Sequence, residues 1–263
     1  MCRLEEKYLS KMLFFHSSPL RERYGMELYF TSRLGGYSLD PYNSLNLGYH
    51  VGDDKSKVEN NRQKVSDLLG LGNDIYCLKQ IHSSKIVTLQ RENKNSLKKE
   101  PPQADALMTS MENTPIMVMG ADCSLIVLAD KANRSIAVVH SGWKGTLNKI
   151  LTSALDHMNK RFASRTKDVL MYIGPAIRRC CYDISRKRLE EFKKVYGEDN
   201  YYEQYSKIYM DLPYLVKMQA MKIGIPDLNI HDSNLCTFCD TRFFSYRREK
   251  NTGRQAAIAI IRD

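Results

Sequence analysis

Three residues whose side chains bind metals or act as nucleophiles lie at breaks in the apolar pattern. His82, Cys123 and His140 each stand in a polar or Gly-rich break directly beside an apolar run. One thiolate and two imidazoles are ligands that zinc favours, and three protein ligands with one open position are typical of catalytic zinc sites. Zinc in such a site can lower the pKa of water to about 7. The separations match no local metal motif, so the convergence of the three residues is a hypothesis about the fold.

The same residues allow interpretations without a catalytic metal. Cys123 could be the nucleophile of a metal-free cysteine hydrolase or deamidase, with His140 as its general base. Alternatively, the protein is a non-catalytic binding module with structural zinc, or Cys123 is a small core residue and the histidines are surface groups. The residue types alone leave these alternatives open.

A candidate anion site follows His140. The sequence Gly-Trp-Lys-Gly at 142–145 comes before the helical pattern Thr146–Met158. A helix N-terminus exposes N–H groups that bind anions, and Lys144 adds a positive charge. A plain helix start with an exposed lysine is the alternative. Neither GxGxxG nor GxxxxGK[ST] occurs, which argues against Rossmann and P-loop nucleotide sites.

The chain contains seven cysteines. Cys236 and Cys239 form a CxxC, which resembles half of a zinc ribbon, but Cys180 and Cys181 are adjacent and poorly spaced for the second half. The favoured interpretation of these four cysteines is therefore that they pack structurally or are incidental thiols. An odd number of cysteines without a recognisable signal peptide favours reduced thiols and a cytoplasmic location.

Length and composition restrict the class of protein. The 263 residues carry a formal charge of +10 and 43% hydrophobic residues, so the chain can bury a core. The basic residues are scattered and lack the layout of a recognition helix or an aromatic RNA-binding sheet, which argues against a nucleic-acid partner. No apolar run approaches the roughly 18 residues of a membrane span, so no membrane partner is expected.

The apolar pattern predicts strands that alternate with helices, joined by an exposed connection at Arg91–Gln103. Such a pattern, with no internal repeat and no linker, indicates one α/β or α+β domain over residues 1–263. The predicted strands are Met26–Ser32, Ile75–Leu78, Lys85–Leu89, Ile116–Met119, Leu125–Leu128, Ile136–Val139, Val169–Ile173 and Ala256–Ile261, and the predicted helices are Lys57–Leu69, Thr146–Met158, Ser185–Tyr196 and Leu212–Ile223.

Eight motifs occur together in one order. They are TSRLGGYS (31–38), NLGYHVGDD (46–54), LKQIHSSKIV (78–87), ADALMTS (104–110), GADCSLIVLAD (120–130), VHSGWKG (139–145), IGPAIRRCCYDI (173–184) and FFSYRREKNTGR (243–254). Together they resemble the polyphenol oxidase-like or laccase-domain purine nucleoside phosphorylase family, which contains bacterial YfiH-type proteins and human FAMIN. The resemblance begins at about Glu27, so residues 1–24 are expected to be an N-terminal extension.

The resemblance implies a single compact domain with a mixed β-sheet packed against helices, remotely similar to a toxin cysteine deamidase. It implies phosphorolysis of adenosine, inosine, guanosine and S-methyl-5′-thioadenosine, together with adenosine deamination, so the expected partners are purine nucleosides and phosphate. The zinc ligands of the family correspond to His82, Cys123 and His140. A copper-dependent polyphenol oxidase is disfavoured, because multicopper sites use many histidines and the chain has six.

The mechanism suggested by the resemblance needs further groups. Phosphate would be held by Arg33, Lys144 and Arg248, and Asp122 would protonate the leaving base or orient a ligand. Arg178 stands where many relatives have glycine, and is expected to add charge near the rim of the pocket. The oligomeric state and the preferred nucleoside do not follow from the sequence.

Overall fold

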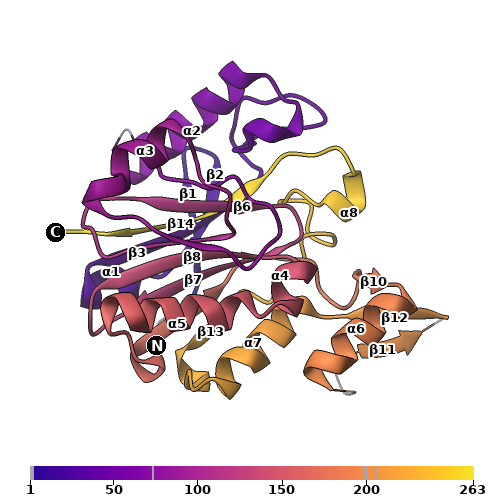
Figure 1. The fold of residues 1–263 in the computed structure, drawn as a ribbon. Helices are drawn as coiled ribbons and strands as arrows, with labels where there is room; N and C mark the ends of the chain where they lie inside the picture. Colours follow the sequence, from indigo (N-terminus) through magenta and orange to yellow (C-terminus); the bar gives the residue numbers. More distant parts are fainter. Residues whose placement is uncertain (1–2, 73, 198–200, 205) are drawn as a thin grey trace.

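The computed structural model describes residues 3–72, 74–197, 201–204 and 206–263. Two β-sheets form its centre, and helices cover their outer faces (Figure 1). The five-stranded sheet has the order β1 (Glu5–Leu9), β2 (Met12–His16), β3 (Met26–Thr31), β14 (Gln255–Ile261) and β6 (Ile116–Gly120). The six-stranded sheet has the order β13 (Ile230–Asp232), β9 (Val169–Ile173), β7 (Ser124–Asp130), β8 (Ser135–Ser141), β5 (Ala106–Thr109) and β4 (Ile86–Thr88).

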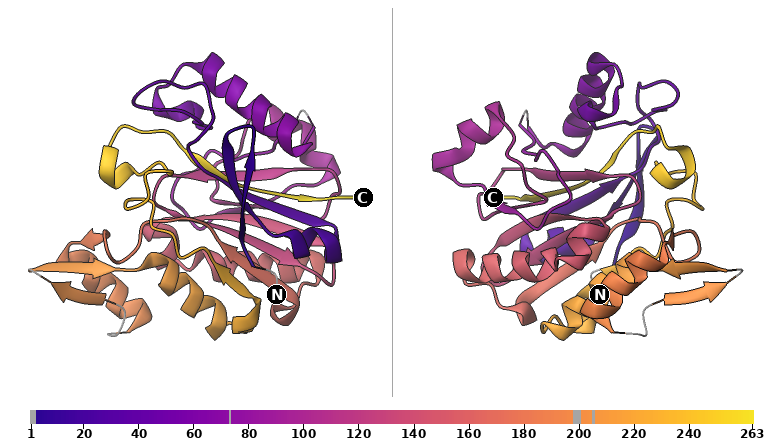
Figure 2. Two further views of the ribbon diagram at one scale, coloured as in Figure 1. Left: turned by 180° about the vertical axis from the view of Figure 1, so that it is seen from behind. Right: turned by 45° about the vertical axis from the view of Figure 1, so that its right-hand side comes forward.

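Helices and a small third sheet complete the fold. The helices are α1 (Ser18–Tyr24), α2 (Lys55–Leu69), α3 (Lys94–Lys99), α4 (Trp143–Leu147), α5 (Ile150–Phe162), α6 (Arg186–Tyr196), α7 (Leu212–Lys222) and α8 (Tyr246–Glu249). The small sheet has the order β10 (Asp183–Ile184), β12 (Lys207–Met210) and β11 (Tyr201–Gln204). It projects with α6 from one end of the molecule (Figure 2). No helix in the described ranges is long and apolar enough to cross a membrane.

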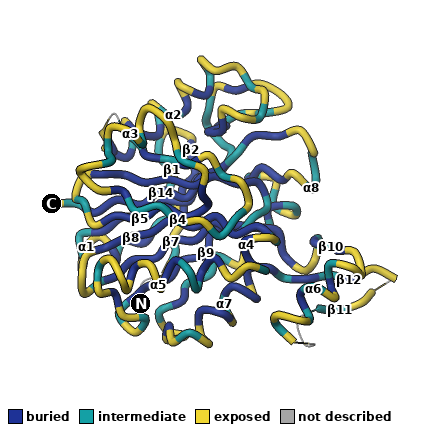
Figure 3. The backbone as a smooth tube through the Cα atoms, viewed as in Figure 1, coloured by how far each residue is buried: buried dark blue, intermediate teal, exposed yellow. Residues whose placement is uncertain are grey.

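The core consists of layers, because each central sheet is apolar on both faces. One buried cluster lies between the two sheets and contains Phe30 from the first and Val127 from the second. A second packs the outer face of the six-stranded sheet against α5 and α7, and a third packs the outer face of the five-stranded sheet against α2. The central strands are therefore buried throughout while the outer faces of the helices are exposed (Figure 3). Burial on both faces explains why these strands appear as continuous apolar runs.

Most of the predicted strands and helices are confirmed. The ends of most of these elements differ from the predicted ends by no more than one or two residues. Ile75–Leu78 is not a strand, since only Tyr76 forms a single bridge to Ile116. The Gln80 side chain then bonds both the N–H and the C=O of Met119, so that a side chain replaces the next backbone pairing. The exposed connection 91–103 contains the short helix α3.

One helix prediction needs correction, and the N-terminal segment contains a hairpin that was not predicted. The helix expected at 146–158 is two helices, because Lys149 adopts a left-handed conformation with φ 55° and separates α4 from α5. Within the predicted N-terminal extension, residues 5–16 form a hairpin whose second strand, β2, pairs with β3 and extends the five-stranded sheet. The consecutive charged residues Glu5, Glu6 and Lys7 in β1 concealed this hairpin in the sequence.

The topology places the reactive residues at one end of the six-stranded sheet. Strands β7 and β8 pair antiparallel with Ser124 opposite Ser141 and Leu125 opposite His140. Cys123, which comes just before β7, therefore lies beside the end of β8 that carries His140. The loop that enters β4 brings His82 to the same end.

Candidate functional site

The three predicted ligands converge. One ligand atom each from His82, Cys123 and His140 lies within 4.8 Å of the other two. The two imidazole rings meet edge to face, with their centroids 4.9 Å apart. Gly142 leaves room for this approach, because a Cβ there would lie 2.9 Å from the Cys123 sulfur and 3.1 Å from a ring carbon of His82. The convergence expected from the breaks between apolar runs is thus present in the fold.

A buried carboxylate that the sequence did not single out positions two of these ligands. Asp105 is fully buried at the start of β5. Its Oδ1 lies 2.9 Å from Nδ1 of His140 and accepts a 3.0 Å bond from the backbone N–H of His82. Its Oδ2 accepts bonds from both the N–H and the hydroxyl of Ser83. Burial by itself raises the pKa of Asp105, but these hydrogen bonds lower it to about 2.

The Asp105 contact determines how His140 presents its ring. With Nδ1 directed at the carboxylate, Nε2 remains for a metal or for the Cys123 sulfur. Burial by itself lowers the pKa of His140 and raises that of Cys123, yet the mutual attraction of imidazolium and thiolate reverses both effects. The pKa of His140 rises to about 9 and that of Cys123 falls to about 6. Without a metal, the pair is therefore charged at neutral pH.

Asp122 has a constrained position beside Cys123. Its φ of 90° is unusual for a residue with a side chain. Three hydrogen bonds hold it there: Oδ1 accepts from the Thr237 hydroxyl at 2.7 Å, Oδ2 from the Arg247 N–H at 2.6 Å, and its C=O from the Ile177 N–H at 2.9 Å. Because both carboxylate oxygens are engaged, the geometry favours the orienting role that was one of the two predicted for Asp122.

A cavity of about 550 Å³ opens over the three ligands. That volume is typical of small-molecule sites. The wall combines aromatic residues with cations, and several of them come from α6, α8 and the segment after α8. Besides the three candidate ligands, the residues that line the cavity include His50, Asp122, Trp143, Ile177, Tyr182, Arg188, Tyr246, Arg247, Lys250 and Arg254.

The structure does not bring the predicted phosphate ligands to this cavity. Arg33 forms an ion pair with Glu249 at 2.5 Å, and Arg248 pairs with the same carboxylate. Lys144 is exposed, with its ammonium 5.6 Å from the centre of the Trp143 ring. None of the three is among the described residues that line the cavity. Arg33 and Arg248 therefore have structural contacts. Phosphate binding by Arg33, Lys144 and Arg248 stays a prediction.

Other cations occupy the wall, and sequence reasoning missed them. The Arg188 guanidinium lies 4.0 Å from the centre of the Trp143 ring, and the Lys250 ammonium lies 5.7 Å from that of Tyr246. Arg254 donates to the carbonyls of Thr252 and Gly253. Within the described part of the chain, none of these three forms an ion pair. Lys250 and Arg254 both belong to the motif FFSYRREKNTGR (243–254), which was the available signal, whereas Arg188 lies in a helix whose pattern shows only an exposed basic face.

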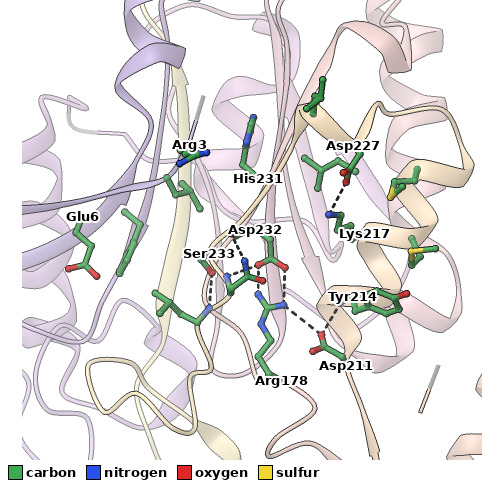
Figure 4. A pocket seen from close by; sticks show the side chains of 18 residues that line it. Arg3, Glu6, Arg178, Asp211, Tyr214, Lys217, Asp227, His231, Asp232 and Ser233 are labelled. Atoms are coloured by element: carbon green, nitrogen blue, oxygen red, sulfur yellow. Dashed lines mark hydrogen bonds and ion pairs between the residues drawn. The ribbon is translucent and has the colours of Figure 1, made fainter. Parts of the chain in front are cut away.

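A second, larger cavity of about 900 Å³ lies between β13 and α7 (Figure 4). Its charged groups mostly neutralise one another: Arg178 reaches both Asp232 and Asp211, and Lys217 pairs with Asp227. Arg178 was expected to add charge near the rim of the catalytic pocket. Instead its side chain lies in this other cavity, bound between two carboxylates. The described lining there includes no group of three metal-binding side chains.

The fold and the site together define a layered α/β domain with a His–Cys–His group at the end of its six-stranded sheet. The chain belongs to the family described as "Multi-copper polyphenol oxidoreductase laccase", whose profile matches residues 27–262. This match confirms the resemblance drawn from the eight motifs.

Named relatives support a more specific comparison. The chain is 33% identical to "Purine nucleoside phosphorylase" of Haemophilus influenzae over 87% of this chain and 91% of that protein. It is 30% identical to "Purine nucleoside phosphorylase YfiH" of Escherichia coli over 87% and 90%, respectively. The crystal structure of YlmD from Geobacillus stearothermophilus superposes with a TM-score of 0.88 and 28% identity, covering 98% of each chain.

We expect Asp105→Asn to weaken metal binding although it changes no ligand. The amide places an NH₂ group against donors that now face a carboxylate oxygen, so His140 and the His82 loop lose their orientation. Loss of such a supporting contact lowers metal affinity by roughly 10–100-fold. Competition with a chromophoric chelator measures the dissociation constant of the metal.

Asp130→Asn is the matched control, because Asp130 is equally buried but holds the turn after β7 through Ala132 and Asn133. Equal metal affinity in wild type and Asp105→Asn would contradict the role of Asp105.

We expect the Cys123 thiol of metal-free protein to react with iodoacetamide at neutral pH. Since its pKa lies below the ordinary value, the reactive thiolate is present above pH about 6 and is lost as the pH falls through that value. Mass spectrometry of the alkylated peptide gives the rate at each pH. In His140→Ala the midpoint should move upward, because the imidazolium and its hydrogen bond are removed. A wild-type midpoint near 9 would show that the two rings do not stabilise the thiolate.

Proposed function

We propose that this protein is a zinc-dependent purine nucleoside phosphorylase of the cytoplasm, acting on adenosine, inosine, guanosine and S-methyl-5′-thioadenosine, with adenosine deamination as a further activity. The names and coverage of its relatives support the class of reaction. The observation that carries the proposal is the His82–Cys123–His140 group at the base of a cavity whose wall holds cations without ion pairs.

The donor set fits zinc. Two imidazoles and one thiolate with an open side towards a cavity correspond to a catalytic zinc site, and Asp105 fixes the tautomer of His140 as carboxylates do in such sites. Multicopper oxidation needs several coppers and more imidazoles, and this is the single histidine-containing group of three ligands within the described residues. Bound zinc would supply a Lewis acid that polarises a substrate oxygen.

The cations of the wall have the chemistry to hold phosphate. Phosphorolysis forms a bond between a phosphate oxygen and C1′ of the ribose while the bond from C1′ to the purine nitrogen breaks. Phosphate must therefore lie beside the sugar, and guanidinium groups bind it through charge-assisted hydrogen bonds. Arg188, Lys250 and Arg254 face the cavity from three segments. We assign them this role in place of Arg33 and Arg248, which pair with Glu249.

The remaining wall suits a purine. Trp143, Tyr182 and Tyr246 present aromatic surface on which a base can stack. Asp122 lies at the same wall, and we assign it the orienting role, because both of its carboxylate oxygens accept hydrogen bonds. Protonation of the leaving base is the alternative role, and it requires the release of one of these two hydrogen bonds.

A metal-free hydrolase or deamidase is the second candidate, and the charge state of the metal-free site is the observation that favours it. The thiolate of Cys123 and the imidazolium of His140 resemble the nucleophile and base of a cysteine enzyme. His82 has no necessary part in that chemistry. Product analysis tests the proposed enzyme: with phosphate, ribose 1-phosphate and free base mean phosphorolysis, and inosine from adenosine means the further deaminase activity. No product from any of the four nucleosides would refute the proposed enzyme.

We expect His82→Ala and Cys123→Ala to lose zinc and phosphorolysis together. Loss of the metal removes several kcal/mol of transition-state stabilisation, which corresponds to a fall of roughly 100-fold or more. Metal analysis and the rate of base release measure both effects, and circular dichroism should stay near wild type. His157→Ala, an exposed histidine on α5, is the control. An active His82→Ala protein without metal would favour the cysteine hydrolase.

We expect Arg188→Ala to raise KM for phosphate by roughly 10–100-fold, because hydrogen bonds to a charged group contribute about 1.5–3 kcal/mol. Initial rates at varied phosphate and saturating inosine give this constant. Its neighbour on α6 supplies the control: Lys187 is exposed and does not line the cavity, so Lys187→Ala should keep the wild-type KM. If both variants changed KM equally, the effect would come from general charge and not from a phosphate contact.

A further inference from the structure

A second group of potential ligands lies outside the catalytic site. Cys180 and Cys181 stand in the loop between β9 and β10, and Cys236 and Cys239 in the turn between β13 and α8. The four sulfurs lie within 4.8 Å of one another. The Cys239 sulfur is 3.3 Å from that of Cys181 and 3.7 Å from that of Cys180. The fold thus brings together the CxxC and the adjacent cysteine pair, although their spacing in the sequence argued against a shared site.

We propose that these four cysteines bind a structural zinc ion, distinct from the catalytic metal. Zinc–sulfur bonds of about 2.3 Å in a tetrahedron place the sulfurs about 3.8 Å apart, close to the separations observed. Four thiolates leave no open position, which is typical of structural and not of catalytic zinc. The separations of 3.3 and 3.7 Å are too long for the S–S bond of about 2.05 Å in a disulfide, and all four cysteines are free.

The backbone around the CxxC is arranged for a bound thiolate. The N–H groups of Phe238 and Cys239 hydrogen-bond the Cys236 sulfur, and so does the N–H of Arg178 from the other segment. Arg248, which pairs with Glu249, also donates to the carbonyls of Thr237 and Phe238 and so holds the turn. N–H contacts of the kind made to Cys236 stabilise the negative charge of a metal–thiolate centre.

An iron–sulfur cluster fits less well. Cysteine ligands of such clusters surround several irons and bridging sulfides, so their sulfurs must lie further apart than around one metal ion. Four sulfurs within 4.8 Å of one another leave space for a single ion. Cys180 and Cys239 are exposed, so zinc can enter from solvent.

The position of the group indicates what the ion would do. The segment with Cys180 and Cys181 also carries Ile177 and Tyr182, which line the catalytic cavity, and the turn with Cys236 carries Thr237. Ile177 and Thr237 each donate a hydrogen bond to Asp122, the residue before Cys123. Zinc would therefore join the two segments that hold this wall. Arg178 secures the first segment from the opposite side through Asp232 and Asp211 (Figure 4).

Zinc content of protein purified without chelator tests the proposal. Elemental analysis by mass spectrometry should give two zinc ions per wild-type chain and one in Cys236→Ser/Cys239→Ser. His82→Ala/Cys123→Ala should also keep one zinc ion. The variant that combines all four substitutions should keep no zinc. Cys77→Ser is the matched control and should keep two, because Cys77 belongs to neither group. Equal zinc in wild type and Cys236→Ser/Cys239→Ser would overturn the structural site, whatever metal the catalytic site holds.

A second measurement covers the case in which the serine variant does not fold. His82→Ala/Cys123→Ala, stripped of metal and loaded with cobalt(II), should show thiolate-to-cobalt charge-transfer absorption that zinc abolishes. Absence of this absorption would refute a thiolate site. Thiol titration of the denatured, non-reduced wild type should find all seven cysteines free. Fewer than seven would show a disulfide in place of the metal.

Discussion

The buried carboxylate of Asp105 is the contact on which the site depends. It accepts hydrogen bonds from three consecutive backbone N–H groups, from the Ser83 hydroxyl and from the His140 ring. The backbone of Asp105 takes part as well, since its C=O accepts the N–H of His140. One residue therefore fixes both the ring of His140 and the loop in which His82 adopts a φ of 57°. In a buried environment such a network is stabilising only when every member is satisfied.

The layered fold explains why the ligands meet where they do. Antiparallel pairing of β7 with β8 brings Cys123 and His140 to one end of a sheet that is buried on both faces. A strand buried on both faces has no freedom to change register, because any shift would exchange the residues of two packed cores. The precision of the candidate metal site thus comes from apolar packing, and the polar loops add His82 and the cavity wall.

The sequence predicts the parts of this protein that depend on local pattern. Runs such as Leu125–Leu128 identified the central strands, and the breaks beside them identified the three residues that converge in the fold. Asp105 could not be singled out, because its role depends on burial and on partners far along the chain. The same limit explains Arg33, whose partner Glu249 lies at the opposite end of the sequence. A basic residue has the same appearance in the sequence whether it faces phosphate or a carboxylate.

Asp122 connects the two cysteine-containing centres. A residue with a φ of 90° is strained, and such conformations persist only where surrounding contacts determine them. All three contacts of Asp122 come from segments that carry or adjoin the Cys180, Cys181, Cys236 and Cys239 group: Ile177 from one, Thr237 from the other, and Arg247 from the start of α8. The conformation of the chain immediately before Cys123 therefore depends on how firmly these segments are joined. The group of four cysteines can in this way determine the geometry of the candidate site, although none of the four lines its cavity.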